Sequence, residues 1–353
     1  MDGVWILVGV AFVAFFALVG AIVFVHELGH YVAARACGVA VQAFSIGFGR
    51  ELVGWTDRAG TRWRLCLLPV GGYVKMSGEA GPEEPGPAGR RAGFCHRPLR
   101  QRALIVLAGP LANLAFAAVT IAALCLAFGR SIPSPEIGAV AAGSPGEAAG
   151  FRPGDRILAV AGRPVDSFAA FAAAAAALGG APVVVMVRRG DRTEQLMLGA
   201  DDGRWDGTFG LVSKGRERVS SGLTDALAYG VRTTGRLAVA TLEALGDLLR
   251  GGAAAQAIAG PLRFAQVSGQ VTLDLGLGAL VLLAALLSVN VAVFNLLPIP
   301  ALDGGHLAFL SLEKLRGRPL PRRVQQMCSL GGLAVIFLLC TLMTANDLVN
   351  LLN

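Results

Sequence analysis

Four long apolar segments dominate the pattern of hydrophobic and polar positions along the chain. Residues 4–25 contain no charged side chain, and a helix of about 22 residues is about 33 Å long, which is enough to cross a bilayer. Similar segments follow at residues 103–128, 277–299 and 329–345. The first is longer than the apolar core of a usual signal peptide and follows no basic residue, so we expect a retained span. The pattern predicts a polytopic α-helical membrane protein with four transmembrane helices.

Polar residues interrupt the third apolar segment. Ser288, Asn290 and Asn295 lie within it, and Pro298 and Pro300 mark its end. Polar groups inside the hydrocarbon region are costly and usually face a protein interior or a watery cavity. Proline removes a backbone donor and interrupts a helix. We therefore expect this segment to end in irregular backbone and to carry functional groups.

The segments between these spans show other patterns. Residues 39–76 have alternating apolar positions and a Gly-Gly pair, which favours β-hairpins lying at the membrane face. Residues 78–93 are a linker rich in proline, glycine and charge. Residues 132–200 combine short strand patterns, a turn-rich loop and an alanine-rich helix, which predicts a compact α/β module. Apolar residues recur at helical spacing over 220–250 and indicate an amphipathic helix on the membrane surface.

Composition supports a membrane protein and argues against other classes. Hydrophobic residues make up 54% of the chain and charged residues 16%, against about 25% charged in a typical soluble domain. A disordered chain, a coiled coil and a small disulfide scaffold are excluded. The net charge of +7 would suit a nucleic-acid-binding protein, but the basic residues flank apolar spans and form no stripe with aromatic residues. We therefore expect membrane lipid, and no nucleic acid, as a partner.

The distribution of basic residues predicts the orientation in the membrane. Residues 31–102 contain eleven Lys or Arg in 72 positions, and residues 304–328 contain five in 25. The long segment 129–276 contains fifteen in 148, which is a lower density. The positive-inside rule then places the first two segments in the cytoplasm. The N-terminus, the long segment with its α/β module and the C-terminus are expected outside.

The sharpest chemical signal is the sequence His26-Glu27-Leu28-Gly29-His30 near the end of the first span. On a helix, His26 and His30 lie one turn apart on the same face, so both imidazoles can reach one metal ion. Neutral imidazole suits Zn²⁺, which takes three protein ligands and a water in catalytic sites. Glu27 projects beside the pair and can take a proton from that water. The motif therefore predicts a zinc hydrolase.

A third protein ligand is needed, and the residues alone leave several candidates. Asp303 follows the two prolines that end the third span and precedes Gly304 and Gly305, which allow a tight backbone approach. An aspartate before two glycines is also a common turn residue. His306, His96 and the remaining acidic residues stay alternatives to Asp303.

Taken together, the motifs resemble those of the site-2 protease family, and more narrowly the RseP-type bacterial intramembrane zinc metalloproteases. The resemblance covers nearly the whole chain, and HExxH together with NxxPxPxLDG is highly specific. Residues 132–200 are similar to a PDZ domain, which binds an extended peptide at a sheet edge; a small α/β spacer without a ligand is the alternative. The motifs that carry the resemblance are HELGH, PVGGYVKM, GPLAN, AGFRPGDRILAVAGRPV, GPLRFAQVSG and NLLPIPALDGGH.

The resemblance implies an endopeptidase that uses one Zn²⁺ ion to cleave transmembrane segments of single-span membrane proteins. It implies that His26, His30 and Asp303 are the zinc ligands and that Glu27 is the general base. Substrates of the implied kind are anti-sigma factors already trimmed by a site-1 protease, or remnant signal peptides. The implied location is the bacterial inner (plasma) membrane, with several passes.

The resemblance also implies a substrate-binding region. Asn295 matches a family asparagine that positions the substrate near the metal, and Pro298 and Pro300 keep the adjoining segment irregular. The hairpin region, with Gly71 and Gly72, resembles a membrane-associated β-region that holds the substrate as an added strand. This is physically reasonable because a helical peptide bond must be unwound before water can attack it.

One feature departs from the best-known enterobacterial members, which carry two tandem PDZ domains. Residues 129–219 have room for only one, so size filtering of substrates by a PDZ pair is not expected. The predicted organisation is transmembrane helix 1 with HExxH at 1–31, a cytoplasmic loop with β-hairpins and linker at 32–102, transmembrane helix 2 at 103–128, an extracytoplasmic PDZ-like domain at 129–215, an amphipathic juxtamembrane helical region at 216–276, transmembrane helix 3 with NxxPxPxLDG at 277–303, a cytoplasmic loop at 304–328, and transmembrane helix 4 with the C-terminal tail at 329–353.

Two functions of other classes are alternatives to proteolysis. A membrane-anchored PDZ module could sequester a partner without catalysis, but such an adaptor needs no intact HExxH. A metal transporter would need more metal-binding residues than four histidines and no chain of acids through the spans. Proteolysis explains both motifs and is the function we expect.

Overall fold

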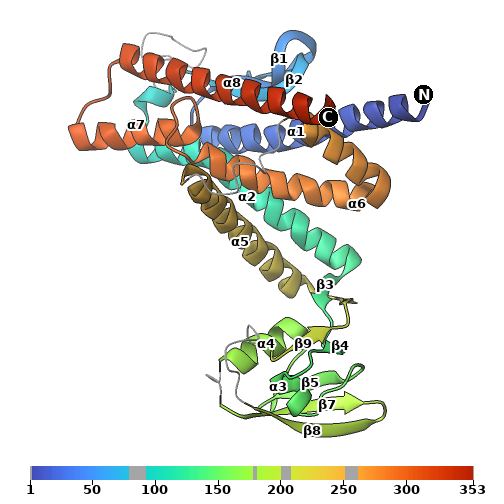
Figure 1. The fold of residues 1–353 in the computed structure, drawn as a ribbon. Coiled ribbons are helices and arrows are strands. Elements are labelled where there is room, and N and C mark those ends of the chain that lie inside the picture. The colour runs from blue at the N-terminus through green and yellow to red at the C-terminus, as the bar shows by residue number, and fades with distance from the viewer. Residues whose placement is uncertain (1, 79–92, 178–180, 200–207, 251–260, 353) are drawn as a thin grey trace. The chain divides into compact units, whose positions relative to one another are not determined.

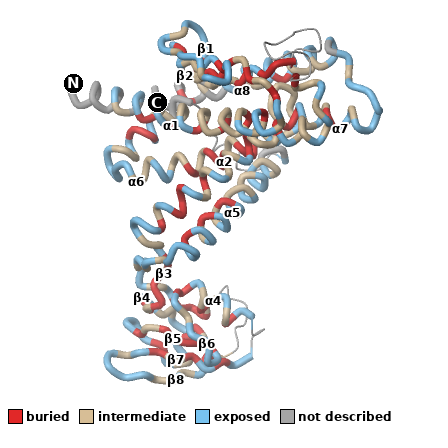
Figure 2. Tube along the Cα trace, turned by 180° about the vertical axis from the view of Figure 1, so that it is seen from behind, coloured by how far each residue is buried: buried red, intermediate tan, exposed pale blue. Residues whose placement is uncertain are grey.

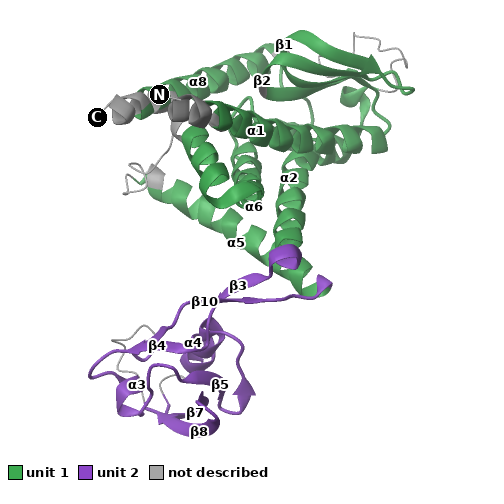
Figure 3. Cartoon of the chain, turned by 90° about the vertical axis from the view of Figure 1, so that its right-hand side faces the viewer, with its two compact units in different colours: residues 1–124, 224–353 green, residues 125–223 purple. Residues whose placement is uncertain are grey.

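The computed structural model describes residues 2–78, 93–177, 181–199, 208–250 and 261–352. The linker predicted at 78–93 falls almost wholly outside these residues. The chain forms two compact units, and the sequence of the second interrupts the sequence of the first (Figure 3). Unit 1 comprises Met1–Leu124 and Thr224–Asn353, and unit 2 comprises Cys125–Leu223.

Three helices among the described residues are long and apolar enough to cross a membrane. They are α1 (Asp2–Ala36), α2 (Leu99–Phe128) and α6 (Pro261–Asn295), all in unit 1 (Figure 1). Helices satisfy their backbone hydrogen bonds internally, which is what a lipid environment demands. The chain is therefore a polytopic membrane protein, and α1 packs directly against α6.

The fourth transmembrane helix remains a prediction. Helix α8 spans Arg322–Leu352, but its described apolar part, Arg323–Leu338, is shorter than the about 20 residues that a span needs. The first two residues of α8 are Arg322 and Arg323, so the apolar segment starts within the helix and not at its first residue.

The predicted limits of the third span need correction at both ends. Helix α6 stops at Asn295 instead of 299, because the prolines that follow cannot continue it. It begins at Pro261 and is interrupted at Gly276, which has φ 77° and ψ −177°. This conformation is open to glycine and costly for other residues. The predicted boundary between residues 276 and 277 thus coincides with a kink inside one longer helix.

A long antiparallel hairpin follows α1. Strands β1 (Val41–Thr56) and β2 (Arg62–Met76) pair with several irregularities in register. At the turn, Asp57 accepts hydrogen bonds from Trp63 Nε1 and from two backbone N–H groups, and these hold the pKa of its carboxyl below the ordinary value. One part of the hairpin packs on α1, whereas the other exposes a set of apolar side chains: Phe48, Leu52, Val53, Trp55, Leu65, Leu67 and Leu68.

The remaining helices of unit 1 are α5 (Leu223–Leu249) and α7 (Asp303–Arg316), with the short 3-10 helix η2 (Phe94–His96) before α2. Helix α5 is amphipathic, as expected, and leaves a row of apolar side chains exposed. Its other face contacts the bundle: a side chain at Gly230 would overlap the carbonyl of Ala118 in α2. Helix α5 is therefore packed against the helical bundle, and its location on the membrane surface stays a prediction.

Unit 2 is a small α/β module. A four-stranded sheet runs in the order β6-β5-β7-β8, and β4 pairs with β9. Apolar side chains from both sheets and from α4 form one core, red in Figure 2. The elements are β4 (Ile137–Val140), α3 (Pro145–Ala148), β5 (Arg156–Val160), β6 (Arg163–Pro164), α4 (Phe168–Ala176), β7 (Val183–Arg189), β8 (Arg192–Leu198) and β9 (Leu211–Ser213).

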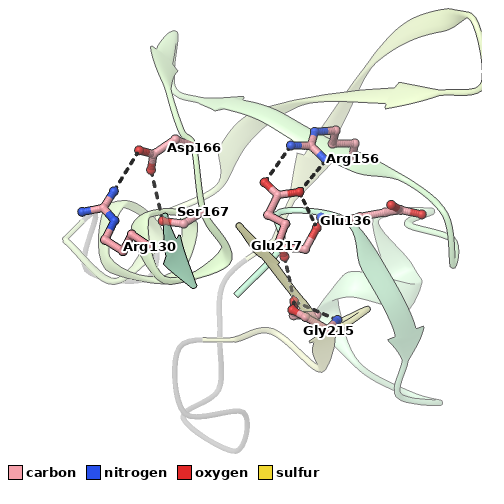
Figure 4. Close-up of polar contacts among 9 residues, drawn as sticks. Arg130, Glu136, Arg156, Asp166, Ser167, Gly215 and Glu217 are labelled. Atoms are coloured by element: carbon pink, nitrogen blue, oxygen red, sulfur yellow. Dashed lines mark hydrogen bonds and ion pairs between the residues drawn. The ribbon is translucent and has the colours of Figure 1, made fainter. Parts of the chain in front are cut away.

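A two-stranded ribbon closes unit 2. Strand β3 (Arg130–Pro133) pairs with β10 (Arg216–Val219), so the unit extends beyond the expected 129–215. Glu217 accepts two hydrogen bonds from Arg156, at 3.0 and 2.9 Å (Figure 4). It also accepts one from Ser134 at 3.2 Å. The Arg156 guanidinium holds the pKa of Glu217 below its ordinary value. This ion pair ties the ribbon to the main sheet.

Candidate metal centre

The two histidines of HExxH lie side by side on the inner face of α1. Their residues are only 9% and 8% exposed, and the Nε2 atoms of His26 and His30 are 3.2 Å apart. Four residues correspond to about one helical turn, which brings both imidazoles to one point. The geometry expected from the spacing is therefore present.

Asp303 approaches both imidazoles from the first turn of α7. Its Oδ2 lies 3.0 Å from His26 Nε2, and its Oδ1 lies 3.4 Å from His30 Nε2. The ligand atoms of the three residues all lie within 4.8 Å of one another. Added side chains at Gly304 and Gly305 would overlap the carbonyls of Leu297 and Ile299, so these glycines allow α7 to start directly against the preceding irregular segment.

The structure also locates the other histidines that are candidates for a third ligand. His306 and His96 line the same cavity as His26. Among the described residues, however, the only cluster of three or more His, Cys, Asp or Glu with suitably placed ligand atoms is His26, His30 and Asp303. Of the alternatives that the sequence left open, the geometry favours Asp303.

The chemistry of the cluster fits a zinc ion. Two imidazole nitrogens and a carboxylate oxygen are typical zinc ligands, and three of them leave a fourth position open. Asp303 Oδ2 is buried and accepts no well-aligned hydrogen bond, although His26 Nε2 is nearby. Buried oxygens without a hydrogen bond are costly, and a cation between the three side chains would remove that cost.

Helix α2 supplies the surroundings of the two imidazoles. The carbonyl of Ile105 accepts a hydrogen bond from His30 Nδ1 at 2.8 Å, and the Asn113 amide lies 3.2 Å from His26 Nδ1. A Cβ at Gly109 would come within 2.9 Å of His26 Nε2, so any larger residue there would displace the imidazoles. Sequence reasoning assigned no role to these residues. The signal was GPLAN, which places a glycine and an asparagine inside an apolar span.

The cluster opens into a cavity of about 780 Å³. Glu27, Asn295 and Gly72 line this cavity together with the three cluster residues, whereas Gly71, Pro298 and Pro300 do not. Asn295 Nδ2 donates to the carbonyl of Val291 at 3.0 Å. The cavity is therefore lined by His26, Glu27, His30 and Asp303 together with Asn295 and Gly72. The three other expected substrate contacts do not line it.

A partly buried ion pair connects α2 with α7 at the same cavity. Arg102 Nη1 donates to Glu313 Oε2 at 3.1 Å, and the side chains are 14% and 16% exposed. Both residues line the cavity, although sequence reasoning gave neither a role. Because Asp303 and Glu313 lie on one helix, this ion pair holds the helix that carries the carboxylate.

A bundle of membrane helices with a His-His-Asp cluster between them is typical of a membrane-embedded metalloenzyme. The model of peptidase family M50, the site-2 protease family, matches residues 14–339. The chain therefore belongs to this family and is a zinc metalloprotease.

Similar proteins cover almost the full chain. A protein of Agrobacterium fabrum whose name describes a zinc metalloprotease is 36% identical over 368 residues, which are 97% of this chain and 96% of the relative. One from Rhizobium meliloti, similarly named, is 35% identical over 95% of both chains. Metalloprotease MmpA of Caulobacter vibrioides is 35% identical over 93% of this chain and 92% of its own length.

Proposed function

We propose that His26, His30 and Asp303 bind one zinc ion and that Glu27 is the general base for hydrolysis of a peptide bond. The observation that carries this proposal is the approach of three ligand atoms from α1 and α7 to within 4.8 Å of one another. These ligands leave one position of a tetrahedral ion open. The resulting activity is endoproteolysis within or near the bilayer.

The neighbouring side chains support this chemistry. A zinc ion bound there would lower the pKa of a water and polarise the carbonyl that the water attacks. Glu27 follows His26 directly and lines the same cavity, so its carboxylate takes the proton of the attacking water and passes it to the leaving amine. Asn295 lies on the cavity wall with Nδ2 already bound to Val291, which leaves Oδ1 to accept a substrate N–H.

The substrates we propose are transmembrane segments of single-span membrane proteins, unwound at the cleaved bond. Gly72 and Tyr73 of β2 line the cavity, so a substrate strand added beside the hairpin would pass close to the cluster. A Cβ at Gly72 would come within 2.7 Å of the Ser45 carbonyl and 3.2 Å of Glu27 Cγ, which supports a requirement for glycine there. Anti-sigma factors trimmed by a site-1 protease and remnant signal peptides have the required form.

The proposed setting is the bacterial inner membrane. The density of basic residues favours cytoplasmic placement of the hairpin and of residues 304–328, with both termini and unit 2 on the other side. A fourth span formed by α8 is part of this proposal. The strand and helix order of unit 2, with the sequence AGFRPGDRILAV, supports a single PDZ-like domain that binds extended peptides.

Replacement of Glu27 by glutamine tests the catalytic assignment. Glu27→Gln keeps the shape of the side chain but removes the base, so we expect cleavage of a model transmembrane substrate in detergent to fall by at least about 100-fold. Zinc content should stay near that of the wild type. Glu243→Gln, on the exposed face of α5, is the matched control and should cleave normally. Normal cleavage by Glu27→Gln would overturn the assignment.

A further inference from the structure

One face of α2 contacts both imidazoles of the cluster. Ile105, Gly109 and Asn113 follow one another at intervals of four residues, so they lie along a single face of the helix. His26 and His30 have the same spacing on α1. Gly109 lies against the Nε2 side of the pair, while Ile105 and Asn113 lie at the two Nδ1 atoms. Residues spaced by one turn on α2 therefore contact the two histidines spaced by one turn on α1.

The contact of Ile105 fixes the proton of His30. A backbone carbonyl only accepts hydrogen bonds, so the 2.8 Å contact requires that His30 Nδ1 carries the hydrogen. In the neutral imidazole, Nε2 then holds the lone pair. This lone pair is directed toward Asp303, as a metal ligand requires.

The contact of Asn113 must do the same for His26. Asn113 is fully buried, its Nδ2 lies 3.2 Å from His26 Nδ1, and its Oδ1 is buried without a hydrogen-bond partner. With Nδ2 donating, His26 would carry its hydrogen on Nε2 and could not bind a metal there. A half-turn of the amide exchanges its two ends, which have the same shape. Oδ1 then accepts the hydrogen of His26 Nδ1.

We propose that Asn113 is a positioning residue for zinc: its Oδ1 accepts the Nδ1 hydrogen of His26 and thereby directs the Nε2 lone pair to the ion. This inference rests on the proposed role of His26 as a ligand. The Asn113 backbone is itself anchored, because Ser288 Oγ of α6 donates to its carbonyl at 3.0 Å. Such outer partners of a ligating histidine orient the ring and raise its affinity for metal.

Two substitutions at Asn113 separate hydrogen bonding from packing. Asn113→Asp keeps an acceptor oxygen at the same place, and Asn113→Leu keeps the size but removes the acceptor. The measurement is the zinc dissociation constant of the full-length protein in detergent, from competition with a chelator, together with the visible absorption of the cobalt-substituted protein. We expect Asn113→Leu to weaken zinc binding by about 10- to 100-fold, with an altered cobalt spectrum. Asn113→Asp should stay within a few-fold of the wild type.

Two further variants complete the test. Asn290 also lies in a helix contact, where it accepts a hydrogen bond from Thr241, so Asn290→Leu is the matched control and should bind zinc normally. His26→Ala should lose the site altogether. Wild-type zinc affinity in Asn113→Leu, or an equal loss in Asn113→Asp and Asn113→Leu, would overturn the inference about Asn113. Wild-type zinc binding by His26→Ala would instead overturn the proposed ligand set. A thermal unfolding curve for each variant identifies a loss that comes from misfolding.

Discussion

Gly109 of α2 lies directly against the two imidazoles of α1. Two imidazoles with Nε2 atoms 3.2 Å apart occupy the surface of α1, and α2 has to pass directly over them. A methyl group at Gly109 would lie 2.9 Å from His26 Nε2 and would also overlap His30. Interiors are packed too densely to absorb such an overlap without movement. The glycine therefore leaves the space that the two imidazoles occupy.

We predict that Gly109→Ala weakens zinc binding and proteolysis together. The added methyl displaces the imidazoles from the positions in which both face Asp303, and overpacking of this kind costs about 1–3 kcal/mol. The zinc dissociation constant should rise by at least about 10-fold, measured by chelator competition. Gly20→Ala, on α1 with open space around its Cβ, is the control and should behave as the wild type. Equal zinc affinities in the two variants would contradict the prediction.

The sequence predicts only those parts of the candidate metal centre that follow from spacing within one helix. His26 and His30 are related by one helical turn, so their common face follows from spacing alone. Asp303 depends on the path of an irregular segment after α6, and the residues left it in competition with His306 and His96. Asn113 is separated from His26 by 87 positions. Its contact depends on the registration of two helices, which periodicity does not determine.

At the scale of elements, unit 2 also combines features that the local sequence predicts with features that depend on contacts between distant residues. Strands β4, β5, β7 and β8 and helices α3 and α4 follow from alternation, alanine content and turn residues and occur where the pattern predicts them, whereas the short strands β6 and β9 carry no such pattern. The closing ribbon of β3 and β10 was not expected, because four residues at each end carry no distinct pattern. An ion pair between distant residues, Arg156 of β5 and Glu217 of β10, links the ribbon to the main sheet. Only the folded unit brings these charges together.

We predict that this ribbon loosens in acid through Glu217. The pKa of Glu217 is lower in the folded unit than in an unfolded chain, so folding favours the charged form. The contribution to stability is complete above about pH 4.3, the ordinary value for glutamate, and is lost as the pH falls through the lower folded value. Hydrogen exchange of the β3 and β10 amides in the full-length protein should therefore accelerate, relative to the rest of unit 2, in this range.

Two variants identify the group responsible. Glu217→Gln removes the carboxyl, so its ribbon amides should exchange faster at neutral pH and should show no additional acceleration in acid. Asp191→Asn, on the exposed turn between β7 and β8, should keep the acid response of the wild type. A wild-type acid response in Glu217→Gln would show that another carboxyl controls the ribbon.

At the scale of the whole molecule, the membrane class follows from composition, whereas the number of spans does not. Helices α1, α2 and α6 have apolar segments of 25 to 32 residues and need no tertiary information to be recognised as spans. Helix α8 mixes polar groups into its apolar part. Whether such a helix crosses the bilayer depends on the neighbours that cover those groups. The chain pattern alone therefore cannot settle the fourth span.

Zinc removal gives a prediction for the whole chain, because the candidate ligands come from its two ends. His26 and His30 lie on α1, and Asp303 lies on α7, so an ion held by all three joins helices that are remote in sequence. A ligand that binds only the folded state at 100 times its dissociation constant stabilises that state by about 2.7 kcal/mol. Treatment with a chelator should therefore abolish proteolysis and lower the thermal unfolding midpoint, and added zinc should restore both. His26→Ala should unfold at the same temperature with and without zinc. A midpoint that zinc raises equally in wild type and His26→Ala would show that stabilisation comes from another site.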